Sequence, residues 1–189
     1  MIAMRKIIVS NLISLDGYFE GLNQDISWFN VGEDFFAYAR NLLNNVDTIL
    51  FGRITYQQMF AYWPDAQNED EVIKEKMNDL KKIVFSNTLE KAEWNNTTIS
   101  HTIIIKRKIE ERVKELKEQP GKDMVIFGSG TIVSELTQAR LIDEYRLIVC
   151  PVILGNGNPL FKSLNERFDL RLINIKQLST GVVMLTYQP

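Results

Sequence analysis

The chain has 189 residues, of which 45% are hydrophobic, so it is long enough for one sizeable packed domain and short for two. Its 22 basic and 24 acidic residues nearly cancel, which argues against the strongly basic face that nucleic-acid binders usually present. No apolar run approaches the roughly 20 residues of a membrane span, and the N-terminus lacks a signal-peptide pattern. We therefore expect one soluble, cytoplasmic domain over residues 1–189 that binds neither nucleic acid nor membranes.

The single cysteine and the single histidine exclude several kinds of site. Cys150 stands alone in an apolar run, so no intrachain disulfide can form and a buried core thiol is the simplest interpretation. His101 has no histidine or cysteine at ligand spacing, which argues against a zinc site and against a Ser-His-Asp triad. The sequence therefore predicts no metal site.

The first half of the chain alternates between strand and helix patterns. Lys6–Leu15 is rich in β-branched residues and predicts a strand buried on both faces, which Asp16-Gly17 ends with turn chemistry. Tyr18–Trp28 reads as a loop. The segments that follow are a helix at Asp34–Asn45, a strand at Thr48–Phe51, a helical face from Tyr56 to Trp63, a helix at Glu69–Leu80 and a strand at Lys82–Phe85.

The second half ends in consecutive strands. One or two short strands are expected within Thr97–Ile105, then a helix at Lys106–Glu118, an apolar run at Met124–Phe127 and a helix seamed by Ile132, Val133 and Leu136. A long strand at Tyr145–Leu154, with Pro151 suggesting a bulge or edge, precedes a hairpin of Leu170–Leu178 and Val182–Tyr187. The pattern predicts an α/β fold of about eight strands, mostly parallel, with an antiparallel edge.

Three strand ends carry glycine or small polar residues, at 52–55, 86–88 and 128–131. If these strands are parallel neighbours, two helix N-termini and a hydroxyl-rich turn face one crevice. Backbone N–H groups at a helix start bind phosphates, and Arg53 with Ser86 or Asn87 suits a 2′-phosphate. Tight turns need glycine and serine in any case, so the binding hypothesis rests on the three turns together. Gly128-Ser129-Gly130 is no Rossmann fingerprint, because Val133 stands where the third glycine belongs.

Other candidate residues have two interpretations each. Asp16 either hydrogen-bonds a polar substrate or serves the Asp-Gly turn. Asp34 is either an acid or substrate anchor, or it caps a helix and complements its dipole. Trp28 and Trp63 either stack on a flat ring or pack in the core. Lys106 either reaches an adenosine phosphate or is a solvated helix end.

The ordered set of motifs resembles the bacterial dihydrofolate-reductase-like proteins. These are related to the C-terminal reductase domain of the bifunctional riboflavin-biosynthesis deaminase–reductase. The motifs are SLDGYFEG, DTILFGRITYQQM, VFSNTL, VIFGSGTIVSEL and LIDEYRLIVCPVILGNGNPLF. The resemblance spans the chain from Lys6 to the final strand. It implies the dihydrofolate reductase fold, an eight-stranded mostly parallel sheet with a C-terminal antiparallel strand.

The resemblance also implies NADPH as cofactor and a set of ligands for it. Gly52, Arg53 and Thr55 would lie on the phosphates, with Ser86 and Asn87 near the 2′-phosphate. The pyrophosphate and nicotinamide would lie along Gly128, Ser129, Gly130, Thr131, Ile132 and Val133. Substrate would lie between the Asp16 loop, the Trp28 region and the helix from Asp34, with Trp63 as a further candidate contact. Asp16 and Asp34 are the candidates for proton delivery.

The implied activity is NADPH-dependent reduction of a small polar heterocycle by a homodimer. The nearest resemblance is to 5-amino-6-(5-phosphoribosylamino)uracil reductase of riboflavin biosynthesis, and a dihydrofolate or pteridine reductase is the alternative. Phe127 stands where the riboflavin-pathway reductase carries a glutamate just before its glycines. Two alternatives of other kinds remain open. One is a non-catalytic nucleotide-binding protein, and the other is a dimerisation scaffold with Tyr145–Leu154 and 156–161 as its interface.

Overall fold

The computed structural model describes residues 4–94, 102–105 and 109–189. The strands are β1 (Ile7–Ile13), β2 (Tyr18–Glu20), β3 (Val46–Gly52), β4 (Lys81–Phe85), β5 (Thr102–Ile105), β6 (Asp123–Ile126), β7 (Glu144–Val149), β8 (Asn158–Pro159), β9 (Arg171–Gln177) and β10 (Val183–Gln188). The helices are α1 (Glu33–Asn45), α2 (Arg53–Tyr62), α3 (Glu71–Asp79), α4 (Ile109–Glu118) and α5 (Gly130–Gln138), with a 3-10 turn at Leu22–Gln24.

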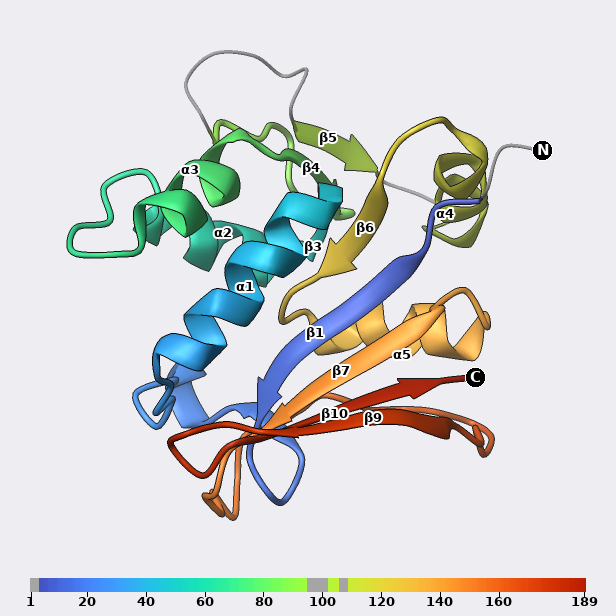
Figure 1. Cartoon of the computed structure of the whole chain (residues 1–189). Helices are drawn as coiled ribbons and strands as arrows, with labels where there is room; N and C mark the ends of the chain where they lie inside the picture. The colour runs from blue at the N-terminus through green and yellow to red at the C-terminus, as the bar shows by residue number, and fades with distance from the viewer. Residues whose placement is uncertain (1–3, 95–101, 106–108) are drawn as a thin grey trace.

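One eight-stranded sheet organises the molecule, in the order β5-β4-β3-β6-β1-β7-β10-β9 (Figure 1). Every pair from β5 to β7 is parallel, and β10 runs antiparallel to both β7 and β9. The predicted fold is therefore confirmed: an α/β, dihydrofolate-reductase-like sheet of eight strands that ends in an antiparallel hairpin. The order also makes β4, β3 and β6 parallel neighbours, so their carboxyl ends share one edge of the sheet.

Helices cover both faces of the sheet, with α1, α2 and α3 on one side and α4 and α5 on the other (Figure 1). Successive strand residues point to opposite faces, so each buried strand feeds both cores. In β1, Ile7 and Val9 pack with α4 and α5, whereas Ile8 packs with α1 and α3. This two-sided burial explains why the strands read as continuous apolar runs.

Two predictions about loops and strand ends were wrong. The predicted loop at Tyr18–Trp28 contains β2, which pairs antiparallel with β8 from the predicted loop near Asn158. The predicted strand Tyr145–Leu154 ends at Val149, and beyond it Leu15 N donates to Val152 O at 2.7 Å. Because β7 is paired on both sides, it has no free edge, and an interface formed by Tyr145–Leu154 with 156–161 stays a prediction. The predicted structure at 97–101 and 106–108, including Lys106, lies outside the described residues.

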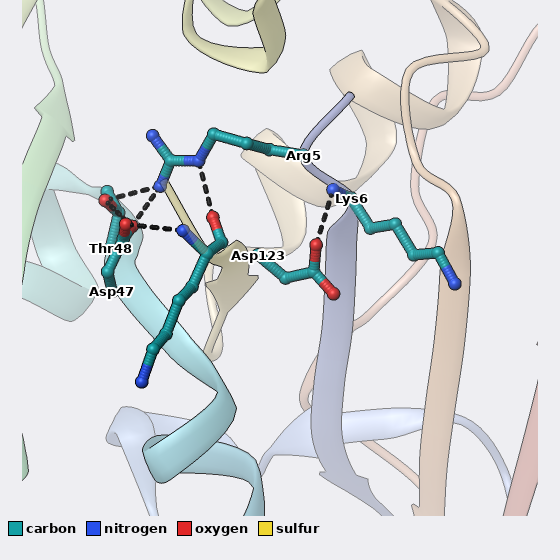
Figure 2. Close-up of polar contacts among 6 residues, drawn as sticks. Arg5, Lys6, Asp47, Thr48 and Asp123 are labelled. Carbon is teal, nitrogen blue, oxygen red and sulfur yellow. Dashed lines mark hydrogen bonds and ion pairs between the residues drawn. The ribbon is translucent and has the colours of Figure 1, made fainter. Parts of the chain in front are cut away.

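A buried arginine ties together the amino ends of β1, β3 and β6 (Figure 2). The Arg5 side chain is only 4% exposed, and its guanidinium forms an ion pair with Asp47. It also donates to Thr48 Oγ1 at 2.9 Å and to Lys122 O at 2.5 Å. Lys6 N donates to Asp123 Oδ1 at 2.8 Å beside it. These contacts fix the register of three strands at the sheet edge opposite the predicted crevice.

A buried lysine gives the fold a dependence on pH. Lys82 is fully buried in β4, where its Nζ donates to Asn78 O and Leu80 O and lies 4.4 Å from the centre of the Trp94 ring. Burial lowers the pKa of Lys82 to about 7. Between that value and the ordinary lysine pKa, the unfolded chain binds more protons than the folded one. The contribution of Lys82 to the free energy of unfolding therefore rises with pH across this range.

We expect Lys82→Met to remove this pH dependence. The wild-type free energy of unfolding should rise from pH 7 towards pH 10, and that of Lys82→Met should rise less over the same range. Urea denaturation at several pH values measures both curves. Lys81→Met, at the less buried neighbour, is the control and should keep the wild-type slope. Parallel curves for the wild type and Lys82→Met would contradict the expectation.

Candidate functional site

A cavity of about 440 Å³ opens at the carboxyl ends of β3, β4 and β6. The starts of α2 and α5 border it from two sides, and the residues after β4 border it from a third. Its lining residues are Phe19, Glu20, Gly52, Arg53, Ile54, Thr55, Phe85, Ser86, Asn87, Thr88, Ile109, Ser129, Gly130, Thr131, Ile132, Glu135, Asn158 and Lys162. The three turns singled out in the sequence thus meet at one cavity.

Most of the residues predicted to bind a cofactor line this cavity. They are Gly52, Arg53, Thr55, Ser86, Asn87, Ser129, Gly130, Thr131 and Ile132. Gly128 and Val133 do not line it, and Val133 is fully buried in the core. Lys106 lies outside the described residues. The sequence therefore predicted correctly that the residues after β3, β4 and β6 meet at one cavity.

Both helix starts at the cavity lack the groups that usually neutralise a helix N-terminus. Gly52 precedes α2 and Ser129 precedes α5, and neither side chain caps its own helix. Neither helix has an acidic residue in its first turn. By contrast, Asp70 caps α3 by accepting from Ile73 N at 3.0 Å. Unpaired N–H groups and two partial positive charges thus border one cavity, an arrangement that favours an anion.

Two hydroxyl groups join the helix starts to each other. Gly52 N donates to Ser129 Oγ at 2.8 Å, and Ser129 N donates to Thr55 Oγ1 at 3.0 Å. Thr55 and Ser129 are only 6% and 7% exposed. Ser129 also adopts a left-handed conformation, with φ of 59° and ψ of 54°, which residues other than glycine rarely adopt. The hydroxyl oxygens of Thr55 and Ser129 thus each accept a bond within the protein, and contact of either residue with a cofactor stays a prediction.

The glycines at this junction allow backbone segments to approach closely. Gly128 has a φ of +57°, and a Cβ there would lie 2.8 Å from Thr55 Cγ2. A Cβ on Gly130 would lie 2.9 Å from Pro159 O and 3.0 Å from the Phe19 ring. Any side chain at either position would push α5 away from its neighbours. Because they lack a Cβ, the two glycines allow α5 to lie close to Thr55, Phe19 and Pro159.

The polar side chains on the β4 side remain available to a ligand. Arg53 is exposed, and its guanidinium contacts only Gln57 Oε1, at 3.0 Å, within the described residues. Ser86 Oγ accepts from Thr88 N at 3.1 Å and Leu89 N at 2.9 Å, which leaves its hydroxyl hydrogen free to donate. Asn87 is exposed beside it. A guanidinium, a hydroxyl and an amide therefore border the same end of the cavity.

The opposite wall was missed by sequence reasoning. Phe19 and Glu20 of β2 line the cavity together with Asn158 of β8 and Lys162, and Asn158 Nδ2 donates to Glu20 Oε1 at 2.6 Å. Strands of two or three residues are too short for a periodicity to reveal them, so no local signal pointed to this wall. Glu135, on the second turn of α5, also lines the cavity, and burial together with nearby Glu110 raises its pKa.

Asp16 lies away from the cavity and holds two loops together. Its carboxylate accepts from Leu154 N at 3.1 Å and Gly155 N at 2.8 Å, joining the loop after β1 to the loop after β7. A hydrogen bond from Ser14, with those from Gly155 and Leu154, lowers the pKa of Asp16. The carboxylate is thus a poor proton donor near neutral pH, and its catalytic role stays a prediction.

Asp34 also lies outside the cavity, in the first turn of α1. Its carboxylate accepts from Ser179 N at 2.6 Å and from Ser179 Oγ at 3.2 Å, which fastens α1 to the turn between β9 and β10. The Ser179 N–H bond lowers the pKa of Asp34. The helix is preceded by Gly32, so Asp34 complements the helix dipole but is not the N-cap residue. Its proposed role as an acid stays a prediction.

The two tryptophans predicted to contact substrate also lie apart from the cavity. Trp28 packs against the cluster formed by Ile148, Cys150, Leu178, Val182 and Met184, and its Nε1 donates to Asp25 O at 3.0 Å. Trp63 packs against the core beneath α1–α3, and its Nε1 contacts Met59 Sδ at 3.2 Å. The structure therefore gives both rings packing partners, and a stacked substrate ring stays a prediction.

Two searches over the described residues bear on other kinds of site. No group of three or more histidine, cysteine or carboxylate side chains in that part of the chain could hold a metal ion. No helix there is long and apolar enough to cross a membrane.

Comparison with known proteins identifies the family of this chain. The family described as RibD C-terminal domain matches residues 5–184. The chain belongs to the RibD C-terminal domain family. The resemblance inferred from the sequence motifs is therefore confirmed. Among curated proteins, this RibD-type chain is 35% identical over 186 residues to the uncharacterized protein YyaP of Bacillus subtilis (strain 168), covering 97% of this chain and 94% of that protein. The uncharacterized protein YwjB of the same organism is 27% identical, covering 94% of this chain and 95% of that protein.

Solved structures share the RibD-type fold at low identity. A putative riboflavin biosynthesis protein from Shewanella sp. PV-4 has a TM-score of 0.75 at 23% identity, covering 97% of this chain and 98% of that one. A deaminase and 5-amino-6-(5-phosphoribosylamino)uracil reductase from Thermotoga maritima has a TM-score of 0.69 at 15% identity. It is matched over 98% of this chain and 57% of its own length. At these identities the structures establish the fold alone.

Proposed function

We propose that this protein is an NADPH-dependent reductase of a small polar heterocycle. The observation that carries the proposal is the cavity where two uncapped helix N-termini meet an exposed arginine. Backbone N–H groups of Gly130–Ile132 and Arg53–Thr55 suit the pyrophosphate, and Arg53 with Ser86 and Asn87 suits the 2′-phosphate. Membership of the RibD C-terminal domain family supports the same proposal.

The chemistry would come from the nicotinamide, which supplies a hydride to a C=N or C=O carbon. The residues of this chain would bind the dinucleotide, orient its reactive ring and exclude water. Phe19 and Ile132 give the cavity apolar surface beside the polar phosphate ligands. The substrate nearest by family is the ribosylaminopyrimidine of riboflavin synthesis, since the Thermotoga maritima relative carries that reductase name. Dihydrofolate or another pteridine is the alternative.

Titration with NADPH and NADH, followed by nicotinamide fluorescence, tests the proposal. Binding of NADPH and its oxidation with a pyrimidine or pteridine substrate are the expected results. Binding without oxidation across both substrate panels would favour the non-catalytic nucleotide-binding alternative. Failure to bind either nucleotide would refute both. The protein would act as one domain in the cytoplasm under this proposal.

Arg53→Ala should reduce the preference for NADPH over NADH. A guanidinium beside a phosphate dianion makes charge-assisted hydrogen bonds that alanine cannot replace, so NADPH binding should weaken about tenfold or more. NADH lacks that phosphate and should lose much less affinity. Fluorescence titration of both nucleotides measures the ratio. Arg167→Ala, outside the cavity, removes an arginine side chain that is 84% exposed; it is the control and should leave the ratio unchanged. An equal loss for both nucleotides would contradict the assignment.

We also propose that the protein is a homodimer, with β9 as its interface. This strand forms one edge of the sheet and is exposed along all seven residues, and Ile175 is 59% exposed. An unpaired edge can pair antiparallel with the same edge of a second copy, and this pairing has the two-fold symmetry that is commonest among homodimers. Ile175→Lys should then yield monomers, as measured by light scattering. A monomeric wild type would refute this proposal.

A further inference from the structure

The two helix starts at the cavity are fastened to each other by side chains that reach across the gap. Ser129 at the start of α5 accepts from Gly52 N, and Thr55 in the first turn of α2 accepts from Ser129 N. Each hydroxyl therefore meets a backbone N–H of the opposite junction. Gly52 and Ser129 are 77 residues apart in the chain, and Thr55 and Ser129 are 74 apart. The link between the two helix starts is therefore a tertiary contact.

We propose that Thr55 and Ser129 are positioning residues that set the spacing between the two helix N-termini, so that both can bind one bridging diphosphate. This inference rests on the proposed dinucleotide-binding function. It assigns the two side chains a positioning role in place of the predicted role as cofactor ligands. They act through the backbone N–H groups they hold in place. The anion itself is left to the free N–H groups of the two first turns and to Arg53.

Three observations support a positioning role for Thr55 and Ser129. Both residues line the cavity, yet they are only 6% and 7% exposed, so they are packed firmly against their neighbours. Thr55 Oγ1 and Ser129 Oγ each accept a backbone N–H of the opposite junction, so both bonds span the gap between α2 and α5. Ser129 retains a left-handed backbone, a conformation that persists where surrounding contacts fix it.

The spacing matters because a diphosphate has a fixed length. Two helix starts can share its charge only if both sets of N–H groups lie at hydrogen-bond distance at once, and a small displacement loses one set. A ligand that carries only one of these two phosphates does not need both helix starts at a fixed spacing. Loss of the hydroxyl contacts should therefore weaken a bridging ligand selectively.

The test compares Thr55→Val, Ser129→Ala and the conservative Thr55→Ser. Binding of NADPH and of adenosine 2′,5′-bisphosphate, which carries one of the two bridging phosphates, is measured by calorimetry. Thr55→Val and Ser129→Ala should weaken NADPH about tenfold or more and change the bisphosphate less than threefold. Thr55→Ser should retain wild-type affinity for both. Thr137→Val is the matched control, since it removes another buried threonine hydroxyl of α5, bonded to Tyr145 at 2.9 Å, away from the cavity.

The outcomes separate the alternatives. Equal weakening of both ligands by Thr55→Val would assign direct phosphate binding and overturn the proposal. NADPH affinity that falls no further than in Thr137→Val would also overturn it. Amide hydrogen exchange gives a readout without ligand: Thr55→Val should speed exchange in segment 127–133 as well as in 50–56. If the wild type binds no NADPH but exchange responds in this way, the proposed function fails, while the coupling of the two helix starts by Thr55 and Ser129 stands. If the faster exchange is confined to 50–56, the coupling of the two helix starts is itself refuted.

Discussion

Gly128→Ala is expected to weaken dinucleotide binding about 100-fold, because it forces the two sides of the cavity apart. The backbone at Gly128 has a φ of +57°, and the new methyl group would lie 2.8 Å from Thr55 Cγ2. The left-handed conformation and the overpacking together should cost about 2–5 kcal/mol of stability. Fluorescence titration with NADPH and urea denaturation measure the two effects.

Gly155→Ala is the matched control for that substitution. Gly155 has a φ of +72°, and no atom lies within 4 Å of the position that its Cβ would occupy. It should show the backbone cost alone, about 1–2 kcal/mol, with NADPH affinity unchanged. Similar binding losses in both variants would mean that backbone strain, and not contact with Thr55, governs the site.

Asp47→Ala is expected to destabilise the fold by about 3 kcal/mol, because it leaves the buried Arg5 guanidinium without its counter-ion. The figure lies at the low end for a buried ion pair because Asp47 itself is 38% exposed and water can partly replace it. Asp47 also accepts from Lys122 N at 2.8 Å, so the link to β6 weakens too. Thermal unfolding should shift down by roughly 6–12 °C.

An exposed ion pair provides the comparison for this buried one. The side chains of Arg167 and Asp169 are 84% and 76% exposed, so Asp169→Ala should leave the unfolding temperature almost unchanged. Asp47→Asn, which keeps an acceptor oxygen without the charge, should fall between Asp47→Ala and the wild type. NADPH affinity should survive in the folded fraction of each variant, since this cluster lies at the sheet edge opposite the cavity. A loss of affinity in folded Asp47→Ala would contradict that separation.

The site was foreseen in part, and the reason lies in how its residues are arranged along the chain. A strand, a glycine turn and a helix start are contiguous, so Gly52–Thr55 and Ser129–Ile132 carried a local signal. Glu20 and Asn158 meet from 138 residues apart through two very short strands, and no local pattern announces such a contact. Asp16 and Asp34 looked available because the N–H groups that occupy them come from distant loops.

By itself, the sequence determined the chain order of the helices and of the strands in the eight-stranded sheet, the antiparallel end of that sheet and the family, but not the short strands β2 and β8. These follow from apolar periodicity and turn chemistry, which act over a few residues and are legible in the chain. The tertiary structure decided how the side chains at the site are used. Thr55 and Ser129 were expected at the cofactor, and the structure adds that each accepts a backbone N–H from across the gap between α2 and α5. These hydrogen bonds form only if α2 and α5 approach closely, and that approach depends on the tight packing at Gly128 and Gly130. Such packing involves residues far apart in the chain, so no local pattern predicts it.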